Sequence, residues 1–172
     1  MKRAILTLAA CTLLTGCASK YRVDAMNTPA NHLPVKSSFY VIQPQDGRYG
    51  NDIYTGSGDM TAQAAVMALS RHVAKVERGQ SPEELTQALN TAKQRGLSNV
   101  FEPTILHWED RATEWSGIPD KITIKYSVYD SATGEVVASS VMSASSKWAT
   151  FGGDHPQDLL PHPTQQFVDK LF

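Results

Sequence analysis

The sequence predicts an α/β domain: a compact two-layer sandwich of about five mixed strands and three helices, in the order β-α-β-α-β-β-β-α. Three observations predict it. In the first half of the chain, β-branched and aromatic runs alternate with stretches rich in helix formers, which is typical of crossover connections between parallel strands. A strictly alternating segment at 121–147 then predicts an antiparallel hairpin. The 172 residues, 41% of them hydrophobic, suit one domain with one core.

The first half supplies two strands and two helices. Residues 38–43 are a β-branched and aromatic run that Pro44 ends, so we expect a buried strand followed by a glycine-containing loop. Alanine, methionine and leucine dominate 59–69, which predicts a helix, and 73–77 predicts a short strand. Residues 81–84 have the form of a capping box, and the apolar repeat after them predicts a helix that ends at Gly96.

The second half supplies three strands and a terminal helix. Residues 99–108 predict a strand in which Pro103 marks an edge or a bulge. Apolar and polar side chains alternate from Ile122 onward, and a turn around Gly134 leads into the returning strand. Leucines and a phenylalanine in 156–172 could dock a last helical segment on the sheet. We therefore expect helices mainly on one face of a sheet whose first strands are parallel or mixed.

The amino terminus has the form of an export signal. Lys2 and Arg3 precede an uncharged run at 4–14, which is too short to cross a ~30 Å hydrocarbon core as a helix. A charged start, a short apolar run and small residues are typical of a secretory signal that is removed. The two cysteines of the chain, Cys11 and Cys17, both lie in this region, which excludes a disulfide scaffold.

The end of this signal resembles the lipobox of bacterial lipoproteins, in the sequence Leu14-Thr15-Gly16-Cys17. The resemblance implies that Cys17 is acylated with palmitate and becomes the first mature residue, anchored in a membrane. Ala18, where an aspartate would favour the inner membrane, favours the outer membrane and its periplasmic side. The alternative is an ordinary signal peptide with a coincidental cysteine.

The predicted domain organisation has three parts. Residues 1–16 form a lipoprotein signal peptide, 17–36 a lipidated tether without a sustained apolar period, and 37–172 a single periplasmic α/β domain. The 16 basic and 17 acidic side chains nearly cancel, so the sequence shows no electrostatic footprint for nucleic acid. We expect the membrane, through Cys17, as the first partner, and an envelope protein or peptidoglycan as a possible second.

The motifs for catalysis are weak. Gly56-Ser57-Gly58 precedes a helix but lacks the residues of a phosphate-binding loop. In a strand, His107 and Glu109 share one face and Trp108 and Asp110 the other, so a metal site there would need help from His155. We therefore predict no catalytic residue, no metal and no cofactor.

The unusual feature is aromatic. Two segments place tryptophans beside acidic and histidine side chains in polar or glycine-containing stretches, which is typical of a recognition surface for a protein or a glycan. The predicted surface comprises Trp108, Glu109, Asp110, Trp115, Trp148, Asp154 and His155. The alternative, which we favour, is that the rings fold back and complete a small core.

The same two tryptophan-containing segments, 101–117 and 146–160, together with 38–42, 58–64 and the lipobox, resemble an uncharacterised family of small bacterial lipoproteins whose domain has no known function. More loosely, the strand, glycine-rich loop and alanine-rich helix look like the amino-terminal domain of the Tol-Pal periplasmic protein and like the curli-secretion lipoprotein. Neither resemblance supplies catalytic residues.

These features predict a non-enzymatic outer-membrane lipoprotein that faces the periplasm and serves as a cell-envelope accessory or assembly factor. The alternative is a glycan-binding module or a hydrolase that uses the tryptophan, acid and histidine surface. The two can be told apart by whether His155 lies near a carboxylate in one concave site.

Overall fold

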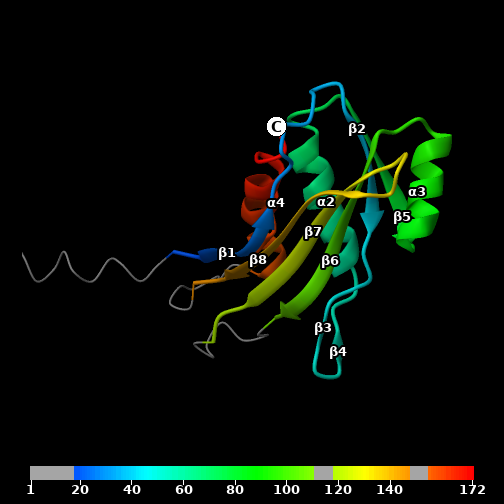
Figure 1. Ribbon diagram of the computed structural model, residues 1–172. Coiled ribbons are helices and arrows are strands. Elements are labelled where there is room, and N and C mark those ends of the chain that lie inside the picture. The colour runs from blue at the N-terminus through cyan, green and yellow to red at the C-terminus, as the bar shows by residue number, and fades with distance from the viewer. Residues whose placement is uncertain (1–17, 111–117, 148–154) are drawn as a thin grey trace, which may run out of the picture.

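Figure 1 shows the computed structural model, which describes residues 18–110, 118–147 and 155–172. These residues form a six-stranded sheet in the order β1-β8-β7-β6-β2-β5 and a separate two-stranded sheet, β3-β4. The strands are β1 (Lys20–Asn27), β2 (Ser38–Gln43), β3 (Arg48–Tyr49), β4 (Asp52–Ile53), β5 (Lys75–Pro82), β6 (Asn99–Glu109), β7 (Lys121–Asp130) and β8 (Val136–Ser145). The helices are α2 (Ser57–Leu69), α3 (Leu85–Gln94), a 3-10 turn (Pro156–Leu159) and α4 (Pro161–Val168).

The predicted fold class and element order are confirmed. β2 pairs in parallel with β5 and β6, whereas β6, β7 and β8 form an antiparallel meander. The sheet has one strand more than the five expected, and the loop after Pro44 contains the small β3-β4 hairpin. Among the described residues, no helix is long and apolar enough to cross a membrane.

The additional strand is β1, in the stretch where the sequence predicted only an irregular tether. Its register with β8 runs from Lys20 opposite Ser145 to Asn27 opposite Ser139. A bulge between Val23 and Ala25 interrupts the alternation of side chains, and most of the strand is exposed. An edge strand that is mostly exposed and contains a bulge lacks the alternating hydrophobic pattern from which a strand is predicted. Residues 20–27 of the predicted tether therefore belong to the sheet.

The main core lies between the sheet and two helices, α2 and α4, which cover the same face (Figure 1). Aromatic rings dominate its centre: the Phe167 ring centroid lies 5.5 Å from that of Tyr126 and 5.9 Å from that of Phe101. All three side chains are fully buried. Aromatic side chains supply the largest apolar area per residue, so this cluster anchors α4 to the sheet.

The third helix, α3, lies on the opposite face of the sheet. Ala88 and Ala92 of α3 pack with Tyr40 and Ile42 of β2 in a second, smaller core. Alanines let the helix approach closely, and Gly96 ends it with a φ of +64°, a left-handed conformation that glycine adopts without strain. β2 is therefore covered by helices on both of its faces, while the rest of the sheet has helices mainly on one.

The predicted capping box before α3 is not formed. Ser81 and Pro82 extend β5 instead, and the helix begins at Leu85. Glu83 takes another role, because the Tyr40 hydroxyl donates a 2.6 Å hydrogen bond to its carboxylate. Burial, together with this carboxylate, raises the pKa of Tyr40 to about 12.

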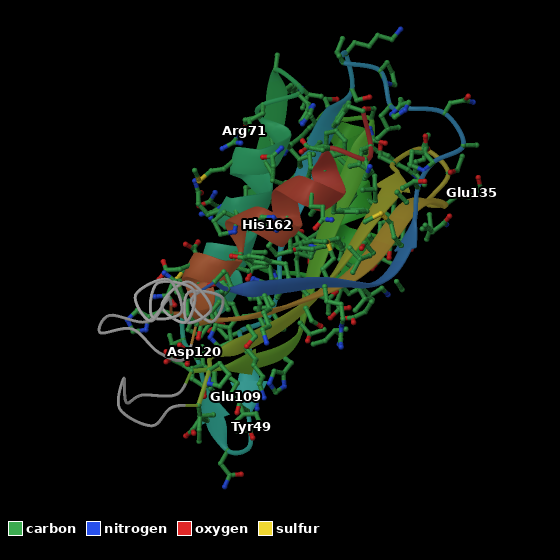
Figure 2. All side chains as sticks on the ribbon, turned by 90° about the vertical axis from the view of Figure 1, so that its left-hand side faces the viewer. Tyr49, Arg71, Glu109, Asp120, Glu135 and His162 are labelled. Carbon is green, nitrogen blue, oxygen red and sulfur yellow. The ribbon has the colours of Figure 1, made fainter. Side chains whose placement is uncertain are left out.

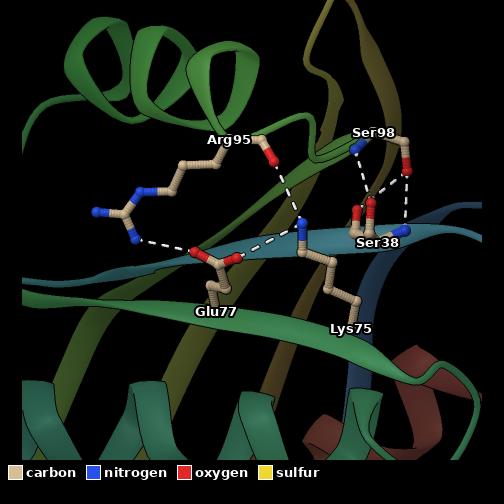
Figure 3. A network of polar contacts seen from close by, with 5 residues as sticks. All are labelled: Ser38, Lys75, Glu77, Arg95 and Ser98. Atoms are coloured by element: carbon tan, nitrogen blue, oxygen red, sulfur yellow. Dashed lines mark hydrogen bonds and ion pairs between the residues drawn. The ribbon is translucent and has the colours of Figure 1, made fainter.

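A polar network joins α3 to the strands beside it (Figure 3). Ser38 and Ser98 bond reciprocally: each backbone N–H donates to the other hydroxyl, at 2.9 and 3.0 Å. Arg95 donates to Glu77 at 2.9 Å, and Lys75 lies 3.7 Å from the same carboxylate. The hydrogen bond from Arg95 is the main reason that the pKa of Glu77 lies below its ordinary value.

The loop before α2 is held by the amino end of that helix. The Gly58 N–H donates to Asp46 Oδ1 at 2.8 Å, and the Gly47 N–H donates to Ser57 Oγ at 2.8 Å. A side chain at Gly58 would place its Cβ 2.3 Å from the Pro44 carbonyl oxygen, so glycine is required there. Backbone amides at the start of a helix can bind anions. The amide of Gly58 is not available for this, because it already donates to the carboxylate of Asp46.

The core makes a prediction about one buried hydroxyl pair. Thr164 Oγ1 donates to the Leu160 carbonyl at 2.7 Å, so the Tyr126 hydroxyl, 2.8 Å away, donates to Thr164. Thr164→Val leaves that hydroxyl buried without an acceptor and should cost about 2 kcal/mol of unfolding free energy. Tyr126→Phe removes only the donor and should cost about 1 kcal/mol.

Urea denaturation of the variants measures both costs. Thr91→Val is the matched control, because Thr91 makes the same hydroxyl-to-carbonyl bond within a helix, to Gln87 at 3.0 Å, but is only partly buried. It should change stability by less than about 0.5 kcal/mol. Equal effects at positions 164 and 91 would contradict this assignment of the hydrogen bonds.

Candidate functional site

The candidate site lies at the end of the sheet where β6 stops and β7 begins. Glu109, the last residue of β6, pairs with Lys121, the first of β7. Figure 2 labels Glu109 and Asp120 there, with Tyr49 of the β3-β4 hairpin beside them. The start of the 3-10 turn at Pro156 contributes His155 to the same end.

Trp108 is part of the main core and not of the surface. Its side chain is 2% exposed and faces the same side of the sheet as Ile122, its partner on β7. The loop before α2 packs closely on it, because a Cβ on Gly47 would lie 2.5 Å from the Cβ of Trp108. This corrects the predicted surface at one position and agrees, for this ring, with the alternative that the tryptophans complete the core.

Glu109 is buried as well, at 2% exposure, on the other side of the sheet. Its Oε2 lies 3.2 Å from His107 Nε2 and 3.9 Å from Lys121 Nζ. The His107 ring meets the Tyr49 ring edge to face, at 5.4 Å between centroids. A buried carboxylate needs compensating charge and hydrogen bonds, and these contacts join the end of β6 to β7 and to the hairpin. The role that this geometry supports for Glu109 is structural.

The structure does bring His155 to two carboxylates. Candidate ligand atoms of Asp110, Asp120 and His155 all lie within 4.8 Å of one another. The backbone of Asp120 is fixed by Ser146, since the Asp120 N–H donates to Ser146 Oγ and the Ser146 N–H donates to the Asp120 carbonyl, each at 2.9 Å. Asp110 and His155 were predicted; Asp120 was missed, because it precedes the alternating strand and carries no motif.

The backbone around His155 is fixed by Asp158. The Asp158 N–H donates to the His155 carbonyl at 2.9 Å, and the His155 N–H donates to Asp158 Oδ2 at 3.0 Å. The cluster offers one imidazole and two carboxylates, whereas zinc sites use three or four protein ligands. Exposed acidic side chains often lie close together without binding an ion, so this grouping is a weak indication of a metal site.

The remaining candidates, Cys17, Trp115, Trp148 and Asp154, lie outside the described residues. Their roles in lipidation and recognition stay predictions. The described residues that flank the two tryptophan-containing segments are nevertheless close together, since Asp110 and His155 belong to the same cluster.

The described residues also line hollows elsewhere on the surface, of which two are large. One, of about 930 Å³, runs between α2 and α4; Met60, Ala64, Met67 and Leu160 are among its apolar residues, and Arg71 and Asp169 among its charged ones. The other, of about 690 Å³, opens on the face of the sheet that lacks helices at β1, and includes Lys20, Arg22, His107 and Lys121. The sequence signalled neither, because both depend on tertiary packing.

Because the cluster of Asp110, Asp120 and His155 contains only one imidazole, we predict that zinc leaves the protein's stability unchanged. Ligand present at a hundred times its dissociation constant would add about 2.7 kcal/mol, which is a rise of several degrees in the melting temperature. We expect a change below about 1 °C on addition of excess zinc, measured by thermal denaturation. A rise of several degrees that His155→Ala abolishes, and that the exposed control His32→Ala keeps, would contradict this expectation.

Comparisons with known proteins give the fold and the family. The chain superposes on PelC from Paraburkholderia phytofirmans, solved as a dodecamer, with a TM-score of 0.62, 14% identity, and 89% of this chain and 94% of that one covered. For lipoprotein GNA1162 from Neisseria meningitidis the TM-score is 0.43 and the identity 14%, with 62% of this chain and 78% of that one covered. For the LpoB C-terminal domain from Salmonella enterica the TM-score is 0.44 and the identity 12%, with 73% of this chain and 87% of that one covered. At such identities the PelC match shows a shared fold.

None of the curated proteins matches the chain in sequence. A family model matches residues 31–171, however, and so covers most of it, including both tryptophan-containing segments. This confirms the resemblance to an uncharacterised family that the sequence indicated. The chain belongs to the DUF4823 family, a domain of unknown function.

Proposed function

We propose that this protein is a lipid-anchored component of the bacterial cell envelope, held through Cys17 in the outer membrane and facing the periplasm. The observation that carries the proposal is the lipobox, Leu14-Thr15-Gly16-Cys17, after a charged start and a short apolar run. The match to a lipoprotein in the structural comparison agrees with this reading without adding weight to it. Multiple acyl chains on Cys17 would give stable anchoring, which a single chain does not.

We further propose that its activity is non-enzymatic, as an accessory or assembly factor. Two side chains of the predicted recognition surface have structural places instead, since Trp108 is in the core and Glu109 is buried beside His107 and Lys121. The similar fold of PelC occurs in a dodecamer, so this fold can serve in large assemblies. Another envelope protein, or peptidoglycan, is the partner that we propose.

One observation supports a second candidate, a glycan-binding module or hydrolase. His155 lies beside Asp110 and Asp120, as an acid–base site would require. Against it stands the surface around the cluster, because Asp110, Asp120 and His155 line neither of the two hollows described above. We therefore place this candidate second.

Anchoring is tested by Cys17→Ser. The variant should leave the membrane fraction and lose metabolic palmitate label, because no sulfur remains for acylation. Cys11→Ser is the matched control in the same segment and should keep both. Cys17→Ser protein that stays in the membrane fraction after a high-salt wash would contradict the proposal, and sedimentation of wild-type membranes on a density gradient decides between the outer and inner membrane.

Partner binding is tested by crosslinking in cells followed by identification of the crosslinked proteins. We expect a specific envelope protein, recovered with wild-type protein and reduced severalfold with Cys17→Ser, because that variant is no longer concentrated at the membrane. The accessory role would be overturned if no partner were recovered while the purified protein bound glycan strands and His155→Ala abolished that binding.

A further inference from the structure

Strand β1 brings the folded domain close to the anchor. Lys20, the first residue of β1, follows Cys17 by three positions, and an extended chain spans at most about 3.6 Å per residue. The lipidated residue would thus lie within about 11 Å of the sheet. This step rests on the proposed lipidation of Cys17. A connection of three residues is no long tether, so one end of the sheet must lie at the membrane surface.

We propose that the hollow on the open face of the sheet, beside the start of β1, binds the phosphate headgroup of an anionic phospholipid. Two rows of side chains cross four strands there. In the first row Lys20, Ser145 and Lys121 are successive cross-strand partners, and in the second Arg22, Ser143 and Thr123 are, with His107 beyond them. All seven residues line the 690 Å³ hollow.

The spacing of these rows suits a phosphate group. Neighbouring strands lie about 4.8 Å apart, so Lys20 and Lys121 stand roughly 10 Å apart with the Ser145 hydroxyl between them. Lysine and arginine are the side chains that proteins use for phosphate, and serine and threonine hydroxyls add neutral donors. The hollow offers both kinds of group on one face.

The charge balance of the hollow is positive. Three fixed cations line it, and two carboxylates stand beside them: Asp24 forms an ion pair with Arg22, and Glu109 lies 3.9 Å from Lys121. Ser143 also donates to Asp24, so this carboxylate has partners of its own. Within the described part of the chain, Lys20 forms no ion pair with a carboxylate. Its ammonium group is therefore the one most available to an external anion.

The position of the hollow favours a lipid over a free anion. A phospholipid phosphate in the headgroup layer would be presented to Lys20 at high effective concentration, because the anchor is only three residues away. The headgroup layer is several ångströms thick, which is comparable with the length of the Lys20 and Lys121 side chains. Contact with it would fix the orientation of the domain on the membrane, with α3 and the β5 edge of the sheet directed away.

The test uses the lipidated full-length protein in vesicles. Amine-reactive labelling with mass spectrometry compares vesicles of phosphatidylcholine with an equal mixture of phosphatidylcholine and phosphatidylglycerol. A basic residue near an anionic surface gains about 1 kcal/mol, so Lys20 and Lys121 should label about fivefold less in the mixture. Lys93, exposed on α3, is the matched control and should label equally in both. High salt should remove the difference.

Each other outcome overturns a defined claim. Equal labelling of Lys20 in the two vesicles overturns this inference while the anchored protein still floats with the lipid, which leaves the proposed function intact. Protein that does not float contradicts the anchoring and, with it, this inference. A decrease in Lys20 labelling caused by inorganic phosphate in vesicles of phosphatidylcholine alone, but not by chloride of the same ionic strength, would assign the hollow to a free anion instead of a lipid. An equal decrease at Lys93 would show general adsorption and overturn the assigned orientation.

Discussion

The burial of β2 on both faces is the constraint on which the rest of this structure depends. Phe39 and Val41 point into the main core, and Tyr40 and Ile42 into the second one. Because alternate side chains of a strand point to opposite faces, four successive apolar residues need cover on both. Two helical crossovers, on opposite faces of the sheet, provide this cover. Helix α2 connects β2 to β5 and covers one face, and α3 connects β5 to β6 and covers the other.

The antiparallel half of the sheet has no such requirement, and its chemistry differs accordingly. In β7, Ile122, Ile124 and Tyr126 are buried in the main core, whereas Lys121, Thr123 and Lys125 lie on the opposite face. No crossover helix is needed between β6, β7 and β8, so on that face α3 reaches these strands only near Val100 and Tyr129. The molecule thus separates a scaffold packed on both sides from an open polar face, and the hollow beside β1 lies on the open face.

What could be predicted from the sequence follows the strength of the local pattern. β2, α3 and the β7-β8 hairpin were predictable because their apolar periods are strong. β1 was not, because its residues are mostly exposed and its bulge at Asp24 breaks the alternation. In the site, the alternation correctly placed Trp108 on the opposite face of the strand from His107 and Glu109. Which of the two faces is buried depends on the pairing of Trp108 with Ile122, which forms only when the sheet folds. Asp120 likewise gains its neighbours only through folding.

The presence of β1 also changes what kind of partner the protein could serve. A tether of some twenty residues would let the domain search a large volume above the membrane. With β1 paired to β8, only Ala18 and Ser19 separate Cys17 from the sheet, so a lipid on Cys17, as proposed above, would limit the reach to about 11 Å. A partner would then have to come to the membrane surface, or lie in it. The groove between α2 and α4, next to β1 through the stacked rings of Tyr21 and His162, would be held at a fixed height for such a partner. If the proposed anchor is correct, the pairing of β1 therefore replaces a long reach with a position close to the lipid.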